Sequence, residues 1–307
     1  MPHFHPHGKL LLTGEYFVLD GVPALAVPTK RGQTFSVSPL PGGPEHDLYW
    51  RAFDVNGERW FNHAFKREEW ARPQVQSEEP AARIRAILHA TETLNPGCTE
   101  KIRGLEVETR LGFDRKWGLG SSSTLIAAVA RWLGVNPYAL LERTFGGSGY
   151  DLACAFAEGP VLYQRNGTEP VVTEPNWKPA WTQRSCFVYL NQKQNSRDGI
   201  RAYRAAGATD AAKENISRIT TALLSPTLHP RAAAQLLLEH EEIVGKTLGL
   251  PPVREKLFPD FPGAVKSLGA WGGDFVWALS EESAEKVRAY FNGLGYEVVI
   301  GYEEMVL

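Results

Sequence analysis

Two glycines and four consecutive hydroxyl residues occupy residues 116–124 and lead directly into an apolar, alanine-rich stretch at 125–130. Glycine allows positive φ and a close approach of the backbone to a ligand. The start of the following helix offers unpaired N–H groups and the positive end of a dipole, which favour phosphate. The run therefore predicts a loop that holds the phosphates of a nucleotide. It is not a Walker loop, because no Gly-Lys-Ser/Thr ends it. A simple helix cap in a Gly/Ser-rich turn explains this run equally well.

Two further segments carry charged residues beside glycines. In residues 7–21, Lys9 opens a short apolar run, Gly14 and Glu15 close it, and a second apolar run follows. An ordinary hairpin with solvated charges is the plainer interpretation. In residues 146–155, Asp151 lies just inside a helix that begins from a glycine-rich turn. An acidic residue that favours the helix dipole explains that position as well.

These three segments, together with a fourth at 264–275, resemble the signatures of the GHMP kinases, which phosphorylate galactose, homoserine, mevalonate and phosphomevalonate. The four motifs occur in the order of that family and span most of the chain. Numbered along the chain, the motifs are the first (7–21), second (116–124), third (146–155) and fourth (264–275). The first and third are most similar to the phosphomevalonate and mevalonate kinase branches, and Gly273-Asp274 favours phosphomevalonate kinase. The resemblance implies an α+β fold of two domains. Residues 1–175 would resemble the second domain of ribosomal protein S5, and residues 176–307 would be ferredoxin-like.

The resemblance also implies ATP and Mg²⁺ as cofactors and assigns roles to individual residues. Asp151 and Lys9 match catalytic residues, and Ser122 and Glu142 are candidate Mg²⁺ ligands. Glu142 lies closer to Asp151 in sequence than the family's metal-binding Glu does, so a solvated surface role is equally open. The expected ATP-binding residues are Lys116, Trp117, Gly118, Leu119, Gly120, Ser121, Ser122, Ser123 and Thr124. The expected substrate-binding residues are Glu15, Ser148, Gly149, Lys193, Ser196, Arg197, Gly272 and Gly273.

The chain departs from the family pattern at several positions. His7 replaces the usual proline before Gly8, and Trp117 precedes the loop where relatives commonly have small residues. Trp117 either stacks on the adenine or packs against the protein. Trp271 replaces a glycine of the fourth motif, and its bulk would narrow the acceptor pocket or close it over substrate. These changes leave the acceptor open.

Composition indicates an enzyme without nucleic-acid or membrane partners. The chain has 307 residues, 43% hydrophobic residues and a formal net charge of −2, so nothing suggests a polyanion as partner. No apolar run approaches the ~20 residues that span a bilayer. The N-terminus lacks the pattern of a signal peptide, and three widely spaced cysteines indicate reduced thiols. We therefore expect a cytoplasmic monomer or homodimer that acts on a small molecule.

Hydrophobic patterns predict the main helices and strands. Strands are expected within 8–39, at 48–53 and 58–61 around Asn56-Gly57, and at 105–109, 161–164, 185–190, 275–279 and 296–300. Helices are expected after Pro80, at 122–133 with Gly134 as the cap, and near 210–224, 231–248 and 281–293. The prolines of 171–181 mark the expected domain boundary. This mixture without a βαβ rhythm predicts an α+β protein.

The expected function is transfer of the γ-phosphate of ATP to phosphomevalonate or mevalonate. Three alternatives remain open from the sequence. A kinase of this type could act on another alcohol, such as homoserine or a sugar. A relative could bind nucleotide without turnover, although Lys9, Ser122 and Asp151 are all present. The related decarboxylase of mevalonate diphosphate usually lacks an Asp at the position of Asp151.

Overall fold

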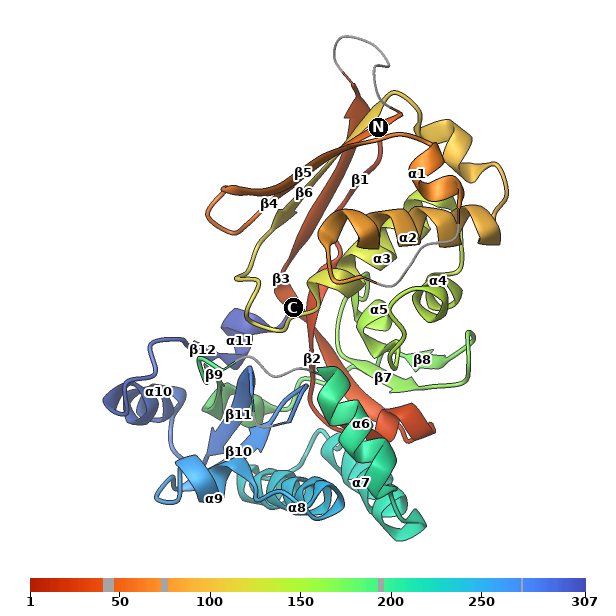
Figure 1. Cartoon of the computed structure of the whole chain (residues 1–307). Helices are drawn as coiled ribbons and strands as arrows, with labels where there is room; N and C mark the ends of the chain where they lie inside the picture. The colour runs from red at the N-terminus through yellow and green to blue at the C-terminus, as the bar shows by residue number, and fades with distance from the viewer. Residues whose placement is uncertain (41–46, 73–76, 193–195, 272) are drawn as a thin grey trace.

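The computed structural model of the chain describes residues 1–40, 47–72, 77–192, 196–271 and 273–307. Within them, an 8-stranded mixed sheet and a 4-stranded antiparallel sheet form the framework. Figure 1 shows the first sheet in the upper part of the molecule and the second in the lower part. The α+β class predicted from the sequence pattern is confirmed.

The larger sheet takes its strands from the first part of the chain, in the order β5-β4-β6-β3-β7-β8, with β1 and β2 also paired to β3. The strands are β1 (His3–Phe4), β2 (His7–Leu11), β3 (Ala24–Pro39), β4 (Leu48–Phe53), β5 (Arg59–Phe65), β6 (Leu105–Leu111), β7 (Val161–Gln164) and β8 (Val171–Thr173). The 16-residue β3 is the spine of this sheet, since it pairs with β1, β2, β6 and β7 along its length.

Local sequence explains several of these strands. β4 alternates buried and half-buried residues, as expected for a strand with one face on a core. β4 and β5 form the hairpin predicted around Asn56-Gly57, where Gly57 has φ +80°. Within the region predicted as strands, residues 8–39, a short 3₁₀-helix η1 (Phe17–Asp20) interrupts the strands instead. That interruption places the Gly14–Glu15 turn against the second sheet.

Helices cover one face of the larger sheet (Figure 1). They are α1 (Glu68–Ala71), α2 (Pro80–Leu94), η2 (Cys98–Ile102), α3 (Ser121–Leu133), α4 (Pro137–Arg143) and α5 (Tyr150–Cys154). α3 buries Ile126, Ala127 and Ala130 against a core that includes Trp50 of β4. It ends at Gly134, which has φ +68° and caps the helix as predicted.

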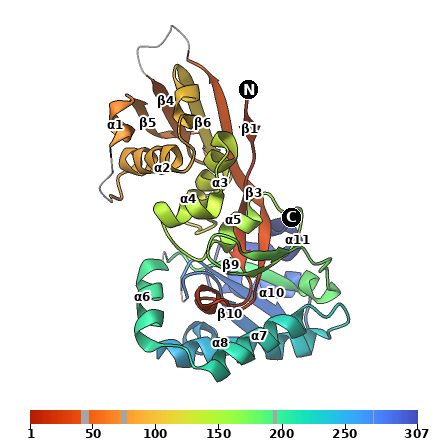
Figure 2. The same cartoon turned by 90° about the vertical axis from the view of Figure 1, so that its right-hand side faces the viewer.

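The second sheet has the order β10-β11-β9-β12. The elements of this part are η3 (Ala180–Arg184), β9 (Ser185–Tyr189), α6 (Ser196–Ala206), α7 (Asp210–Leu223), α8 (Pro230–Leu248), α9 (Val253–Leu257), β10 (Gly263–Ser267), β11 (Phe275–Ser280), α10 (Ala284–Gly293), β12 (Val299–Gly301) and α11 (Tyr302–Met305). In Figure 2, α6 stands at the left edge, between α4 above it and α8 below. α6 was not predicted as a helix; the sequence analysis only expected its first residues, Ser196 and Arg197, at the substrate.

The two sheets share one hydrophobic core. Leu10 and Val27 of the first sheet pack in the same buried cluster as Phe187 and Trp277 of the second. The end of the chain also returns to β3, where the Leu307 N–H donates to the Pro28 carbonyl at 3.1 Å. Apolar burial on this scale is the main force that holds two such layers together. The shared core therefore fixes the position of the two sheets relative to each other.

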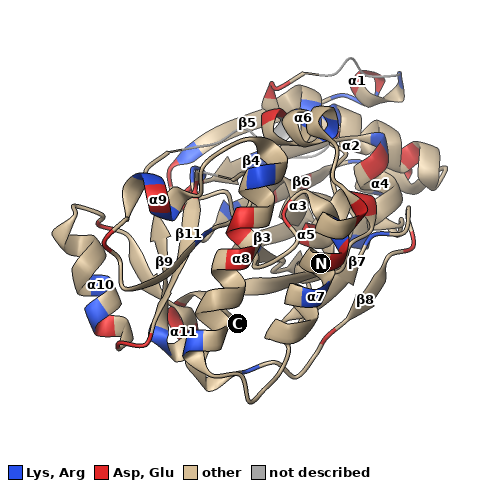
Figure 3. Ribbon diagram, turned by 90° about the horizontal axis from the view of Figure 1, so that it is seen from below, with Lys and Arg blue, Asp and Glu red and all other residues tan. Residues whose placement is uncertain are grey.

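Charge and hydropathy agree with the composition. Figure 3 shows basic and acidic residues side by side on α9 and α10. Among the described residues, no helix combines the length and the apolar character needed to span a bilayer.

Candidate active site

A cavity of about 770 Å³ lies where the glycine-rich loops meet α6 and the second sheet. It collects residues that are far apart in sequence, which is typical of a ligand site. Its lining includes Lys9, Leu11, Tyr16, Val18, Leu19, Glu78, Arg83, Arg115, Gly118, Gly120, Ser121, Ser122, Ser123, Ser148, Gly149, Tyr150, Asp151, Ile200, Gly269, Ala270 and Asp274.

The loop before α3 forms one wall of the cavity. Gly118 and Gly120 have φ of +66° and +91°, so the chain turns there in a way that other residues rarely adopt. α3 begins at Ser121, and the hydroxyl residues Ser121, Ser122 and Ser123 all line the cavity. The first N–H groups of a helix have no carbonyl partner within it. This wall therefore offers N–H donors, hydroxyls and a positive dipole end.

Lys9 and Asp151 hold this loop from two sides. The Lys9 ammonium, on β2, donates to the Gly118 carbonyl at 3.0 Å and lies 5.4 Å from the centre of the Tyr150 ring. The Ser123 hydroxyl donates to Oδ2 of Asp151 at 2.9 Å. Asp151 is in the first turn of α5, and this helix begins directly after Gly149, which has φ +88°. A cation and a carboxylate therefore face the same cavity across a glycine loop.

Four of the predicted ATP-binding residues do not line this cavity. Leu119 is fully buried in the core, and the Thr124 hydroxyl donates to Gln33 at 2.7 Å. Lys116 is exposed. Trp117 packs edge-on against Phe275, with ring centres 5.6 Å apart, so it packs against the protein rather than extending into the cavity.

The other predicted residues are divided between the cavity and the rest of the molecule. Ser148 and Gly149 line the cavity, whereas Gly273 does not. Glu142 is exposed on α4, 3.9 Å from Arg165, and is not in the lining, so the structure does not bring it to Ser122. Lys193 and Gly272, and the side chains of Ser196 and Arg197, lie outside the described residues.

The cavity also contains residues that the sequence did not assign to it. Arg115 and the ion pair of Arg83 with Glu78 lie in its lining, and Leu11, Val18, Leu19 and Ile200 form an apolar wall. Asp274 has φ +48°, and its carboxylate lies on the loop: a Cβ on Gly118 would be 2.3 Å from Asp274 Oδ2. The charged and apolar residues carry no local signal, since tertiary structure alone brings them here.

A second, smaller cavity of about 140 Å³ shares six lining residues with the first: Glu78, Arg83, Arg115, Ser121, Ser122 and Phe145. Its other walls are mainly apolar and aromatic, formed by Trp50, Ala52, Trp60, Phe61, Pro80, Ile84, Leu111 and Leu125. Flat aromatic walls beside a phosphate-type loop provide a surface on which a ring can pack.

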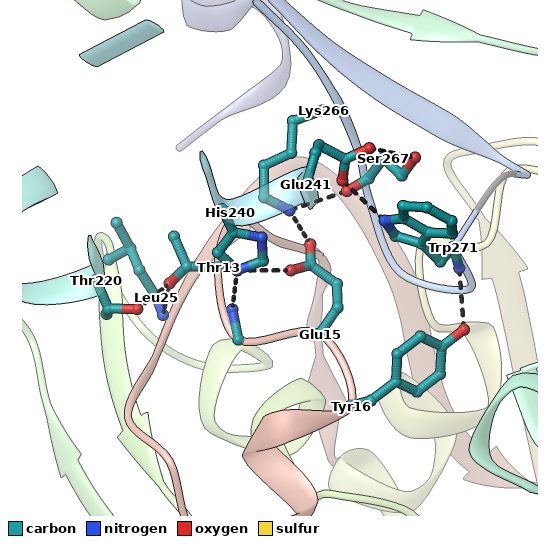
Figure 4. Close-up of polar contacts among 11 residues, drawn as sticks. Thr13, Glu15, Tyr16, Leu25, Thr220, His240, Glu241, Lys266, Ser267 and Trp271 are labelled. Carbon is teal, nitrogen blue, oxygen red and sulfur yellow. Dashed lines mark hydrogen bonds and ion pairs between the residues drawn. The ribbon is translucent and has the colours of Figure 1, made fainter. Parts of the chain in front are cut away.

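Glu15, expected at the substrate, is instead fully buried and does not line the cavity. Figure 4 shows it between Lys266 and His240. Its Oε1 forms an ion pair with the Lys266 ammonium, and both side chains are 0% exposed. His240 lies on its other side, where Nε2 accepts the Gly14 N–H at 2.9 Å. That nitrogen carries no proton, and burial lowers the pKa of His240 well below its usual value, so the ring is neutral. Glu15 thus connects the first glycine turn to β10.

Glu241 extends the same buried cluster toward the fourth motif (Figure 4). It accepts hydrogen bonds from the Trp271 indole N–H at 2.8 Å and from the Ser267 hydroxyl at 3.0 Å. Trp271, which was expected to narrow or close the acceptor pocket, points into this cluster and is only 7% exposed. Burial raises the pKa of Glu241 to about 7, while the Lys266 ammonium opposes the shift.

Glu241→Gln tests this arrangement through the pH dependence of stability. The pKa of Glu241 is higher in the folded than in the unfolded protein, so its contribution to stability is complete below pH 4.5 and is lost as pH rises through about 7. Relative to wild type, the variant should therefore gain on the order of 2 kcal/mol in unfolding free energy between pH 5 and pH 8. Urea unfolding at both pH values measures this difference. Glu15, Lys266 and His240 face the same group and remain in both proteins. An equal change in both proteins would contradict the assignment.

Comparison with solved structures gives near-complete overlaps at low identity. The Streptococcus pneumoniae phosphomevalonate kinase complex with phosphomevalonate and AMPPNP has a TM-score of 0.66 and 19% identity, over 97% of this chain and 98% of that chain. The Methanococcus jannaschii mevalonate kinase has a TM-score of 0.67 and 14% identity, over 97% and 96%. The Lactococcus lactis galactokinase complex with galactose has a TM-score of 0.67 and 12% identity, over 97% and 93%.

The chain has the GHMP kinase fold. No protein-family model and no curated protein sequence matches it. The similarity to solved structures confirms the GHMP kinase fold that was predicted from four short motifs. In this version of the GHMP kinase fold, the first and fourth motifs meet in the buried cluster around Glu15, while the second and third meet at Ser123 and Asp151.

Proposed function

We propose that this chain is an ATP-dependent phosphotransferase of the GHMP kinase type. One observation carries the proposal: Lys9, Asp151 and the Ser121–Ser123 turn face a single cavity across a glycine loop. Phosphoryl transfer requires in-line positioning, neutralised phosphate charge and a destination for the proton of the acceptor. These groups supply all three.

Each of these residues has a role in the transfer. The acceptor oxygen attacks the γ-phosphorus, the bond to the β,γ-bridging oxygen breaks, and ADP leaves. Asp151 orients the attacking oxygen, which is the hydroxyl of mevalonate or a phosphate oxygen of phosphomevalonate, and takes its proton where it carries one. The Lys9 ammonium stabilises negative charge on the transferred group. The start of α3 binds the phosphates of ATP, and the aromatic second cavity fits its base. The Streptococcus pneumoniae neighbour, bound to AMPPNP, supports ATP as the donor.

The donor set also fits Mg²⁺. Magnesium binds oxygen ligands and takes only one or two from protein when phosphates and water supply the rest. Ser122 lines the cavity at the helix start, beside Ser123 and its partner Asp151. Ser122 would hold the ion against the phosphates, where the ion neutralises their charge.

Ser122→Ala should raise the Mg²⁺ concentration needed for half-maximal activity, by about tenfold, with a smaller effect at saturating Mg²⁺. The reason is the loss of one oxygen ligand from a site that retains the others. Titration of activity against free Mg²⁺ measures the change, with Thr124→Ser as a control outside the cavity. An unchanged Mg²⁺ dependence would transfer the role to Ser121 or Ser123.

We propose phosphomevalonate or mevalonate as the acceptor. Lys9 and Arg115 line the cavity and can each pair with an anionic group of the acceptor, whereas Arg83 is already paired with Glu78. Leu11, Val18, Leu19 and Ile200 add an apolar wall, which suits a hydrocarbon segment better than a sugar covered with hydroxyls. Phosphomevalonate is favoured of the two on the Gly273-Asp274 pair of the fourth motif.

A single screen tests the proposal. ADP release is measured with mevalonate, phosphomevalonate, homoserine and galactose, and CO₂ release with mevalonate diphosphate. We expect ADP release with phosphomevalonate or mevalonate. Use of galactose alone would overturn the acceptor and leave the kinase activity. CO₂ release, or ATP binding without turnover on any acceptor, would overturn the proposed reaction.

A further inference from the structure

Tyr16 has a backbone conformation that is rare for a residue with a side chain. It has φ +61° and ψ −42°, and the Phe17 N–H donates to the Glu15 carbonyl at 2.7 Å across it. These values describe a γ-turn with positive φ, a strained form that is uncommon in proteins. Such strain persists when surrounding contacts fix it, and it concentrates at functional sites.

The surrounding contacts come from two walls of the cavity. The Tyr16 ring stacks on Tyr203 of α6, with centroids 5.8 Å apart and planes at 20°. The backbone of α6 also touches the hydroxyl, because a Cβ on Gly199 would lie 2.2 Å from Tyr16 Oη. On the other side, Oη accepts the backbone N–H of Trp271 at 3.1 Å. The side chain is 8% exposed and lines the cavity itself.

Residues next to these contacts, on α6 and on the loop after β10, line the cavity. Ile200 follows Gly199 on α6, and Gly269 and Ala270 precede Trp271. Figure 4 shows Tyr16 reaching toward Trp271 from the turn that also carries Glu15. The buried Glu15–Lys266 ion pair holds this turn against β10, and it therefore also fixes the backbone position of Tyr16.

We infer that Tyr16 is a positioning residue that sets the distance between α6 and the loop after β10. It thereby shapes the end of the cavity that Ile200, Gly269 and Ala270 line, which we call the acceptor end. Its hydroxyl is the common contact: Gly199 packs on it and Trp271 donates to it. Gly199 is required because a side chain there would occupy the space of the hydroxyl. The consequence for the acceptor rests on the proposed kinase function, whereas the coupling of the two walls does not.

Hydrogen–deuterium exchange without substrate tests the coupling directly. Tyr16→Phe keeps the ring and removes only the oxygen. It should speed exchange in peptides covering both α6 and residues 263–271 by about tenfold, because Trp271 loses its acceptor and Gly199 its contact. Gly293→Ala replaces a helix glycine with nothing within 4 Å and serves as the control. Unchanged exchange in either segment of the Phe variant would overturn the inference, whatever the protein phosphorylates.

Steady-state kinetics tests the consequence for the acceptor. Tyr16→Phe and Gly199→Ala should each raise the acceptor KM about tenfold with little change in the KM for ATP. Removing the oxygen relieves the closest contact of the new methyl group and leaves Cζ at 2.8 Å. The double variant should therefore have an acceptor KM below the product of the two single effects. The positioning role of Tyr16 would be overturned if the effects of the two substitutions on the acceptor KM simply multiplied. It would also be overturned if the KM for ATP rose as much as the KM for the acceptor. Wild-type protein inactive on every acceptor would refute the proposed function instead, and the exchange result would still decide the coupling.

Discussion

Replacing Asp151 by Ala is expected to lower kcat by about 10²- to 10⁴-fold, the usual contribution of a positioned acid–base group. Asp151 lines the main cavity, and its carboxylate is held by the Ser123 hydroxyl at 2.9 Å on the phosphate-type loop. The Ala variant should still fold and bind ATP, because the glycine turns and the N–H groups of α3 are intact. Single-turnover kinetics and ATP-binding calorimetry separate the two effects.

Glu142→Ala is the matched control for this experiment. It also removes a carboxylate near the third motif, but Glu142 is exposed on α4 and does not line the cavity. We expect kcat and the Mg²⁺ dependence of this variant to equal those of wild type. If Asp151→Ala retains more than about half of wild-type kcat, Asp151 is not the proton acceptor. A loss of Mg²⁺ affinity in Glu142→Ala would restore the metal role that the sequence suggested.

Lys266→Met is expected to reduce the free energy of unfolding by about 3–5 kcal/mol, the cost of leaving a buried charge without its partner. Lys266 and Glu15 are both fully buried and form an ion pair, and Lys266 also donates to the Ser267 carbonyl at 2.9 Å. A domain is stable by only about 5–15 kcal/mol, so this loss is large. Chemical denaturation followed by intrinsic fluorescence measures it.

A double variant and a surface control make this result specific. Glu15→Gln combined with Lys266→Met removes both charges and should recover much of the lost stability. Lys286→Met removes an exposed ammonium on α10 that is paired with Glu282, and exposed pairs contribute little. If the Lys266 variant is no less stable than the Lys286 variant, the buried pair does not stabilise the fold. If the double variant is as unstable as Lys266→Met, the loss comes from packing rather than from charge.

Short-range signals allowed much of the fold to be predicted. The glycine–hydroxyl run forms a turn and then α3, because positive φ at Gly118 and Gly120 and an apolar helical face are properties of neighbouring residues. The Asn56-Gly57 hairpin and the Gly134 cap follow from the same local chemistry. The four motifs also identified the fold, and their candidate residues Lys9, Ser122 and Asp151 lie together in one cavity.

Elements without a clear local signal could not be predicted in this way. No helix was predicted at α6, which is rich in polar residues, and η1 interrupts a region that has the apolar content of strands. α6 owes its position to tertiary contacts, such as the stacking of Tyr203 on Tyr16 and the hydrogen bond from the Tyr203 hydroxyl to Asp20. Such contacts override weak local propensity.

The partners of the site residues were decided only by the tertiary structure. The sequence places a Glu in the first motif, but Lys266, 251 residues away, makes it a buried structural carboxylate. It places Trp117 beside the loop, but in the structure that ring is partly buried and packs against Phe275 of the second sheet. It gives no sign that Arg83 and Ile200 meet at one cavity. Local patterns fix the backbone conformation of a segment, whereas a side chain's role depends on which distant segment the fold packs against it.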